Sequence, residues 1–197
     1  MKQLILSFIL ISAFQFSKAQ KDQDSKLELP TKDNIIFFEG VVNVDPAMTN
    51  KELYTKAREW FVNYYKSAND VLQMDDKEEG LLIGKGLHKY SFLNGLNTSE
   101  ISLYFTVNIA VKDGKYRYQI YNFNGKNSNR SALDAMSSTP SGSSITEVNF
   151  DDEYKMLVTD GSRKKYRTKL LTGLKAEVLA IVLSLEKAMK SKASNEF

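Results

Sequence analysis

The stretch that decides the fold is Glu100-Ile-Ser-Leu-Tyr-Phe-Thr-Val-Asn-Ile-Ala-Val-Lys-Asp-Gly-Lys-Tyr-Arg-Tyr-Gln-Ile120. From Ile101 to Val111, apolar side chains alternate strictly with other side chains, which is the pattern of a β-strand with one buried face. Asp113-Gly114 follows as the centre of a favoured two-residue turn, because both central positions of that turn want a positive φ. The stretch is therefore predicted to be a β-hairpin whose turn fixes the register.

That register places the apolar side chains of both strands on one face. Counting back from the turn, the apolar pairs are Val111 with Tyr116, Ile109 with Tyr118, and Val107 with Ile120. The opposite face pairs Ala110 with Arg117, Asn108 with Gln119, Thr106 with Tyr121, and Tyr104 with Phe123. We expect the first face to join the core and the second to look outward, since cross-strand neighbours share one side of a sheet.

The segments before the hairpin predict strands and one helix. Residues 34–44 are rich in β-branched and aromatic residues and read as a strand that stops at Asp45-Pro46. A capping box of Thr49 and Glu52 and a staple of Met48 on Leu53 then start a helix. Its apolar face holds Leu53, Ala57, Trp60, Phe61 and Tyr64. A short strand at 69–74, a charged turn at 75–80 and a strand at 81–92 follow.

The segments after the hairpin predict a loop and a long helix. Residues 124–144 are rich in Asn, Ser and Gly and are expected to be a long mobile loop. Residues 145–158 are ambiguous, with a strand as one interpretation. From about Lys165 an apolar stripe at helical spacing runs to Met189, broken only by Gly173. The prediction is a single α+β domain over 34–192, with helices on one face of a curved antiparallel sheet.

The first residues predict export. Met1–Ala19 has a positive start, an apolar run and the small-x-small triplet Ser17-Lys18-Ala19, which is typical of a secretory signal peptide cleaved after Ala19. A membrane anchor is the alternative, but about 11 apolar residues fall short of the roughly 20 that span a bilayer. Residues 20–33 are polar and are expected to be a flexible leader. We therefore expect a periplasmic or extracellular protein.

Charge and cysteine content narrow the classes of function. The chain has no cysteine, which excludes a lipoprotein anchor, disulfides, thiolate metal sites and cysteine nucleophiles. The formal charge of +3 falls to +1 once Lys2 and Lys18 are removed with the signal peptide. A nearly neutral chain lacks the basic footprint of a nucleic-acid binder. No cofactor and no metal site is expected.

Several pieces together resemble an exported family of the Bacteroidetes. They are Leu29-Pro-Thr-Lys-Asp33, Glu39-Gly-Val-Val42, Arg58-Glu-Trp-Phe61, Asp75-Asp-Lys-Glu78, Ile83-Gly-Lys-Gly86 and Tyr116-Arg-Tyr118. The family is a domain of unknown function with a TATA-binding-protein-like (TBP-like) fold, and the resemblance covers roughly residues 29–123. It implies a helix packed on a curved antiparallel sheet and an extracytoplasmic address. It implies no activity and no DNA binding, because sites rather than folds determine function.

Gly84-Lys85-Gly86 lies beside His88, the single histidine of the chain, and superficially suggests a phosphate loop. The spacing of a P-loop fails, because Leu87 follows where that loop needs Ser or Thr. We interpret 81–92 as a strand whose glycines allow close approach of Trp60 or Tyr64. With no second histidine or cysteine, His88 is expected to be a strand residue rather than a metal ligand, although it could act as a general base.

Three charged runs are interpreted mainly as solvated surface. Asp75-Asp-Lys-Glu-Glu79 and Asp151-Asp-Glu153 could supply carboxylates for Ca²⁺ or for acid and base catalysis, but neither has the spacing of a calcium loop. Arg163-Lys-Lys-Tyr-Arg167 could contact anionic lipid. Membrane association beyond a weak contact of this basic run is not expected.

The outward face of the hairpin is the best candidate for a binding surface. Rings, amides and a guanidinium give apolar area together with directed hydrogen bonds, which is typical of interfaces. Its members are Tyr104, Thr106, Asn108, Arg117, Gln119 and Tyr121. The alternative is a face that is covered by the 124–144 loop or simply wet. The leading hypothesis is a non-catalytic binding or assembly module that contacts an envelope protein or glycan, and the alternative is an extracytoplasmic hydrolase using acidic residues and His88.

Overall fold

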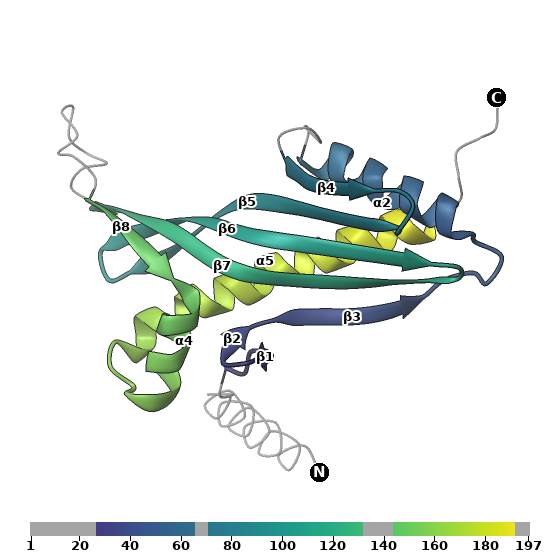
Figure 1. The fold of residues 1–197 in the computed structure, drawn as a ribbon. Helices are drawn as coiled ribbons and strands as arrows, with labels where there is room; N and C mark the ends of the chain where they lie inside the picture. The colour runs from purple at the N-terminus through teal and green to yellow at the C-terminus, as the bar shows by residue number, and fades with distance from the viewer. Residues whose placement is uncertain (1–26, 66–70, 132–143, 192–197) are drawn as a thin grey trace, which may run out of the picture.

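The computed structural model describes residues 27–65, 71–131 and 144–191. One antiparallel sheet has the strand order β3-β7-β6-β5-β4, and β8 pairs with the far part of β7. The strands are β3 (Phe38–Asn43), β4 (Leu72–Asp76), β5 (Leu81–Asn94), β6 (Asn97–Lys112), β7 (Lys115–Ser131) and β8 (Ser144–Asn149). The helices are α2 (Asn50–Tyr65), α4 (Phe150–Thr159) and α5 (Lys164–Lys190). The predicted α+β class, with a curved antiparallel sheet and a long C-terminal helix, is confirmed (Figure 1).

The predicted hairpin is β6 and β7, and its register is confirmed next to the turn. Val111 pairs with Tyr116, Ile109 with Tyr118 and Val107 with Ile120. At the turn, Gly114 has a φ of 68°, but Asp113 is not in the left-handed region that we expected of both residues. The neighbouring segment accounts for this, because Asp113 accepts from Asn50 N at 2.6 Å and Gly114 N donates to Met48 O at 2.9 Å.

A β-bulge corrects the predicted pairing of Tyr104 with Phe123. Thr106 pairs with Tyr121 but Tyr104 pairs with Asn124, so β7 holds one extra residue there. The bulge is accommodated at Asn122, whose φ is 62°. Asn tolerates this left-handed conformation better than most residues. Side chains beyond it change face, and Phe123 therefore lies buried in the core instead of on the outward face.

Helix α2 begins as predicted. Thr49 N donates to Glu52 Oε2 at 2.8 Å, and Glu52 N donates to Thr49 Oγ1 at 3.3 Å, which completes the capping box. Leu53 and Phe61 are fully buried on the face that was predicted to be apolar. The helix therefore covers the sheet with that face, and its charged residues remain outside.

The structure of the N-terminal segment differs from two predictions, the flexible leader at 20–33 and the single strand at 34–44. Two short strands, β1 (Thr31–Lys32) and β2 (Ile35–Ile36), form a hairpin, so the described part of the expected leader is ordered. Asp33 and Asn34 both have positive φ and form its two-residue turn. The expected strand at 34–44 is consequently divided at Phe37 into β2 and β3. The predicted signal peptide lies outside the described residues.

The region after the hairpin departs most from the prediction. Residues 124–131 continue β7 instead of starting a loop, and Ser144 already belongs to β8, while 132–143 lie outside the described residues. Polar side chains occur inside this strand because they have polar partners, as when Asn127 Nδ2 donates to Tyr166 Oη at 3.0 Å. The ambiguous segment 145–158 is a strand followed by α4, which Asn149 caps by accepting from Asp151 N and Asp152 N. The short strand expected at 69–74 is β4, at 72–76.

Helix α5 runs along the sheet behind β5, β6 and β7, and α2 lies beside it (Figure 1). Its buried stripe fits the predicted spacing and consists of Tyr166, Arg167, Leu170, Leu171, Leu174, Val178, Ile181, Leu185 and Met189. Gly173 interrupts the stripe because the Tyr90 ring occupies the space of its missing Cβ. Tyr90 Oη in turn donates to Leu170 O at 2.7 Å. The core thus lies between one sheet face and these helices, and no helix within 27–65, 71–131 or 144–191 lies on the other sheet face.

Candidate binding face

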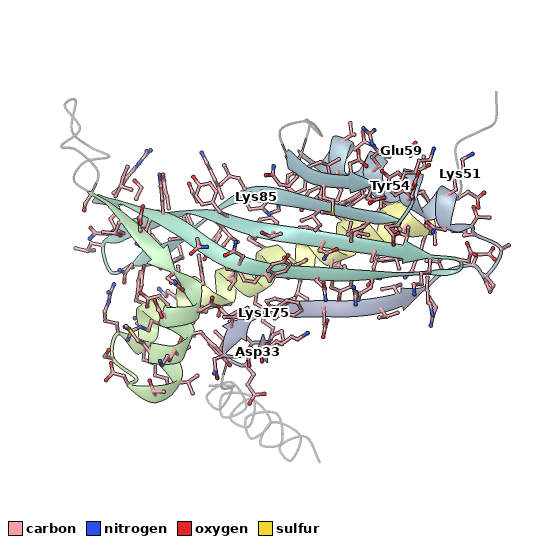
Figure 2. The ribbon with its side chains drawn as sticks, viewed as in Figure 1. Asp33, Lys51, Tyr54, Glu59, Lys85 and Lys175 are labelled. Carbon is pink, nitrogen blue, oxygen red and sulfur yellow. The ribbon has the colours of Figure 1, made fainter. Side chains whose placement is uncertain are left out.

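The side of the sheet away from the helices, called the open face below, faces the viewer in Figure 2. Alternation along the strands and their register decide which residues lie there. Lys85, labelled on β5 in Figure 2, pairs with Thr106 on β6, which pairs with Tyr121 on β7. The helices α2, α4 and α5 pack on the opposite side (Figure 1). None of the helices in the described part of the chain covers the open face.

The six residues predicted for binding all lie on the open face, but they are unequal in exposure. Tyr104 is 40% exposed and Arg117 is also exposed, whereas Asn108, Gln119 and Tyr121 are half-buried. Thr106 is only 7% exposed, so little of its side chain is accessible to a partner. Its small side chain lies between the longer side chains of its cross-strand partners Lys85 and Tyr121.

A line of hydrogen bonds crosses the middle of the open face. Asn108 Nδ2 donates to Gln119 Oε1 at 3.2 Å, and Gln119 Nε2 donates to Glu39 Oε2 at 3.2 Å. Asn108 Oδ1 is buried without a hydrogen-bond partner. The line joins β6, β7 and β3 and orients the two amides, so they present fixed donors and acceptors rather than freely rotating groups.

Aromatic and aliphatic side chains lie beside this line. Tyr121 stacks on Phe37 with ring centroids 5.4 Å apart, which fixes its ring and occupies one side of it. Leu87 pairs with Tyr104 across β5 and β6, and both are exposed. The open face therefore combines exposed apolar area with directed polar groups, as expected.

A shallow hollow lies at the turn end of the open face, with a volume of about 250 Å³. Its lining, called the cationic hollow below, is Val41, Ala110, Lys112, Lys115, Tyr116 and Arg117. Val41 and Ala110 pair with Arg117 from either side, and Lys112 pairs with Lys115. Of these residues, only Arg117 belongs to the binding surface predicted from the sequence. The register of β3 on β7 could not be read from the sequence, so Val41 was not placed beside it.

His88 lies on the helix side of β5, which agrees with the strand interpretation. Its Nδ1 is 2.8 Å from Glu177 Oε2 of α5, and the rings of Tyr64, Tyr65 and Phe105 surround it. The histidine side chain is 15% exposed. Its position is therefore largely determined by packing between the sheet and the helices.

The glycines beside His88 allow close packing, although against different residues from those we expected. A Cβ at Gly84 would lie 2.6 Å from Phe61, and a Cβ at Gly86 would overlap Phe105 and come within 2.8 Å of Tyr65 Oη. Helix α2 does approach the strand here, but through Phe61 and Tyr65 rather than Trp60 or Tyr64.

The first acidic run connects β4 to α2. Asp75 accepts from Tyr54 Oη and, at 2.8 Å, from Arg58 Nε. Burial alone would raise the pKa of the Asp75 carboxyl, but the hydrogen bonds from Tyr54 and Arg58 outweigh it and lower that pKa. Burial and the bond to Asp75 raise the pKa of Tyr54, labelled in Figure 2, to about 12. Asp76 accepts from Glu78 N and Glu79 N at 3.0 Å, which forms the turn.

The second acidic run begins α4. Asp151 accepts from Ile36 N at 2.7 Å and ties the first hairpin to α4, and burial raises the pKa of its carboxyl. Glu153 accepts from Arg167 Nε at 2.8 Å. The structure thus places the two acidic runs and His88 in three separate locations, each with partners of its own.

The basic run is partly internal. Arg167 is 4% exposed and held by Glu153, and the Arg163 guanidinium lies over the Tyr166 ring at 4.4 Å. The expectation of a fully solvated run is therefore wrong for Arg167, which is not available to bind lipid. No helix in the described ranges is long and apolar enough to cross a membrane. The described residues also contain no group of three His, Cys, Asp or Glu side chains arranged to hold a metal.

Comparison with known proteins agrees with this architecture. Residues 38–126, from β3 into β7, match the family described as a domain of unknown function (DUF4468) with TBP-like fold. This region is a DUF4468 domain. The match ends inside β7, so β8, α4 and α5 complete the sheet and its helical layer outside the matched DUF4468 region.

Two solved structures from Bacteroidetes share the fold. A TBP-like protein from Parabacteroides distasonis is similar with a TM-score of 0.60 at 12% identity, over 81% of this chain and 96% of that one. A DUF4468 family protein from Bacteroides ovatus is similar with a TM-score of 0.56 at 14% identity, over 85% of this chain and 94% of that one. At these identities the likeness shows the fold alone. No curated protein matches the sequence.

Proposed function

We propose that this chain is an exported, non-catalytic binding or assembly module of the bacterial cell envelope. Export is supported by the signal-peptide pattern of Met1–Ala19, and the binding role by the open face. The partner is a protein or a glycan. The open face contacts it through Tyr104, Arg117 and Tyr121, with the Asn108 and Gln119 amides between them.

One observation carries the proposal. A sheet that packs helices on one face leaves the other to water, and such a face is usually mostly polar. Here Val41 is 64% exposed, Leu87 46% and Tyr104 40%. Their exposure among oriented amides and an exposed guanidinium is a composition found at interfaces, where aromatic residues and Arg are enriched.

The experiment is capture of envelope components by the purified protein and by the variant Tyr104→Ala, Arg117→Ala, Tyr121→Ala. The matched control carries Thr172→Ala, Leu179→Ala, Leu183→Ala on the exposed side of α5. We expect the open-face variant to fold and to lose a specific component that both wild type and control retain. Equal capture profiles for all three proteins would contradict the proposal.

A second candidate function, an extracytoplasmic hydrolase, is favoured by the His88–Glu177 contact, because a carboxylate that orients a histidine is one part of a general base. The test is turnover of chromogenic ester, phosphate and glycoside substrates by wild type and His88→Asn. Activity that His88→Asn abolishes would favour the hydrolase. Activity that survives the substitution would count against a role for His88.

A further inference from the structure

Three cationic side chains gather at the cationic hollow. Lys112 and Lys115 face each other directly across β6 and β7, and Arg117 follows Lys115 on the same face. Side chains opposite each other in an antiparallel pair have Cβ atoms roughly 4.5–5.5 Å apart, and like charges at such positions destabilise the sheet. Within residues 27–65, 71–131 and 144–191, none of the three cations forms an ion pair.

Three nearby carboxylates have other partners. Glu39, two residues before Val41 on β3, accepts from Gln119 Nε2 at 3.2 Å. Asp113 lies in the turn between the two lysines, but its Oδ1 accepts from Asn50 N at 2.6 Å. Asp45 accepts from Ala47 N at 2.9 Å. These carboxylates are held by other donors and form no ion pair with Lys112 or Lys115 among the described residues. The two lysines face each other directly, and a bound anion would relieve the repulsion between them.

The volume and lining of the hollow indicate the size and chemistry of the group that it can bind. Its volume of about 250 Å³ lies below the roughly 300–1,000 Å³ of sites that enclose drug-sized molecules. Val41 and Ala110 give it an apolar floor beside the cations. One small unit with an apolar side and an acidic group fits this arrangement, such as one residue of a longer chain.

Further cations continue along the open face. Lys85 lies in the middle of β5, and Lys89 and Lys126 lie farther on, each paired with Ser102. Lys112 and Ser102 are ten residues apart on β6, which is about 33 Å at the rise of a β-strand. Lys126 also faces Glu147 across β7 and β8. A ligand that carries acidic groups along an extended chain would therefore meet cations at separate points along this length.

The position of the cations favours a saccharide over a peptide. An acidic peptide recognised in extended form adds to a free sheet edge through its backbone. Most of these cations lie on β6 and β7, whose backbones are paired on both sides, and only side chains face outward there. Sugar rings pack their C–H faces on apolar and aromatic side chains and need no backbone ladder.

We propose that the cationic hollow binds an acidic residue of an envelope polysaccharide. Its carboxylate lies among Lys112, Lys115 and Arg117, and its ring packs on Val41 and Ala110. This inference rests on the proposed function, since it names the class of partner that the open face takes.

The test measures binding of polygalacturonate, neutral dextran and polyglutamate to the purified full-length protein. The variant Lys112→Gln, Lys115→Gln, Arg117→Gln is compared with a control of equal charge change, Lys51→Gln, Lys77→Gln, Lys155→Gln. We expect polygalacturonate to bind wild type and control alike and the hollow variant at least about tenfold more weakly, as three exposed ion pairs would give. Binding weakens as salt rises, because these charges are exposed. Dextran does not bind because it has no acidic group, and polyglutamate binds more weakly than polygalacturonate because it has no ring to pack on Val41 and Ala110.

Thermal unfolding separates lost binding from lost folding. Because the hollow variant removes the Lys112–Lys115 repulsion, its Tm rises while its affinity falls. No binding of polygalacturonate to wild type, equal binding by the hollow variant, or equal binding of polyglutamate would each overturn the inference. The capture experiment with the Tyr104, Arg117 and Tyr121 variant still reports on the proposed function in every one of these cases.

Discussion

At the scale of single residues, charged side chains hold the elements together through specific partners. Asp75 joins β4 to α2 by accepting from Tyr54 and Arg58, and Glu153 joins α4 to α5 through Arg167. Sequence patterns showed these residues only as charged runs. Arg58 lies 17 positions from Asp75 and Arg167 lies 14 positions from Glu153, and no short-range spacing rule connects them.

Asp75→Asn should lower the stability of the protein at pH 7 by about 1–2 kcal/mol, because it removes charge-assisted hydrogen bonds that are partly exposed. The folded-state pKa of Asp75 is lowered, so the stability it contributes is present above the unfolded pKa of about 3.9 and is lost as the pH falls through the folded value. Urea unfolding of wild type and Asp75→Asn at pH 7 and at pH 3 measures the difference in stability between them. The gap between wild type and variant should narrow at pH 3, and an equal gap at both values would contradict the assignment.

At the scale of elements, the sequence predicted what local rules determine. The β6–β7 hairpin has both an alternating pattern and a short turn, and the start of α2 has a capping box, so both were found. Helix α4 was missed although Asn149 is an N-cap residue, because ten residues with few apolar positions give a weak helical period. The bulge at Asn122 depends on how Phe123 fills the core and has no local signal.

The bulge gives a prediction about Asn122, whose φ of 62° lies in the left-handed region. Asn122→Gly should be neutral or slightly stabilising, because glycine takes this conformation without strain. Asn122→Val should destabilise by about 1–3 kcal/mol, because a β-branched residue is strained there. Chemical denaturation measures the stability of the two variants. Equal stability of Asn122→Gly and Asn122→Val would contradict the prediction and would mean that the bulge has moved to another residue.

Helix α5 gives a prediction about Gly173. In an ordinary helix interior, replacing Gly by Ala stabilises by about 1 kcal/mol. Here Gly173→Ala should instead destabilise, because the new Cβ overlaps the Tyr90 ring. Thermal unfolding should show a lower Tm for Gly173→Ala. In a Tyr90→Ala background, Gly173→Ala should be neutral or raise the Tm. If Gly173→Ala lowers the Tm equally with and without the Tyr90 ring, the packing argument is contradicted.

At the scale of the whole molecule, the fold depends on contacts between segments that lie far apart in the chain. The sequence predicted the layers, because the alternating strands and the helical stripe each need a partner face. It could not show where β3, β8 and the first hairpin pair, because several registers satisfy the same short apolar patterns. For the same reason the open face was located but the cationic hollow was not.

The DUF4468 region alone should not fold, since α5 lies outside it and supplies much of the cover of the core. We expect a fragment of residues 27–131 to show poorly dispersed amide resonances and to bind a hydrophobic dye, whereas the full chain does neither. Adding a peptide of residues 164–190 should restore part of the dispersion. A well-dispersed spectrum from the fragment alone would show that α5 is dispensable.

The extra residue at Asn122 has a consequence for how related chains can differ in length. A strand repeats every two residues, so the parts of β7 before and after this point are out of phase by one. A relative that lacks the extra residue must gain or lose one more position elsewhere in the same strand, or every side chain after that point would exchange inside for outside. Length differences in this strand among relatives should therefore come in even numbers, or in compensating pairs.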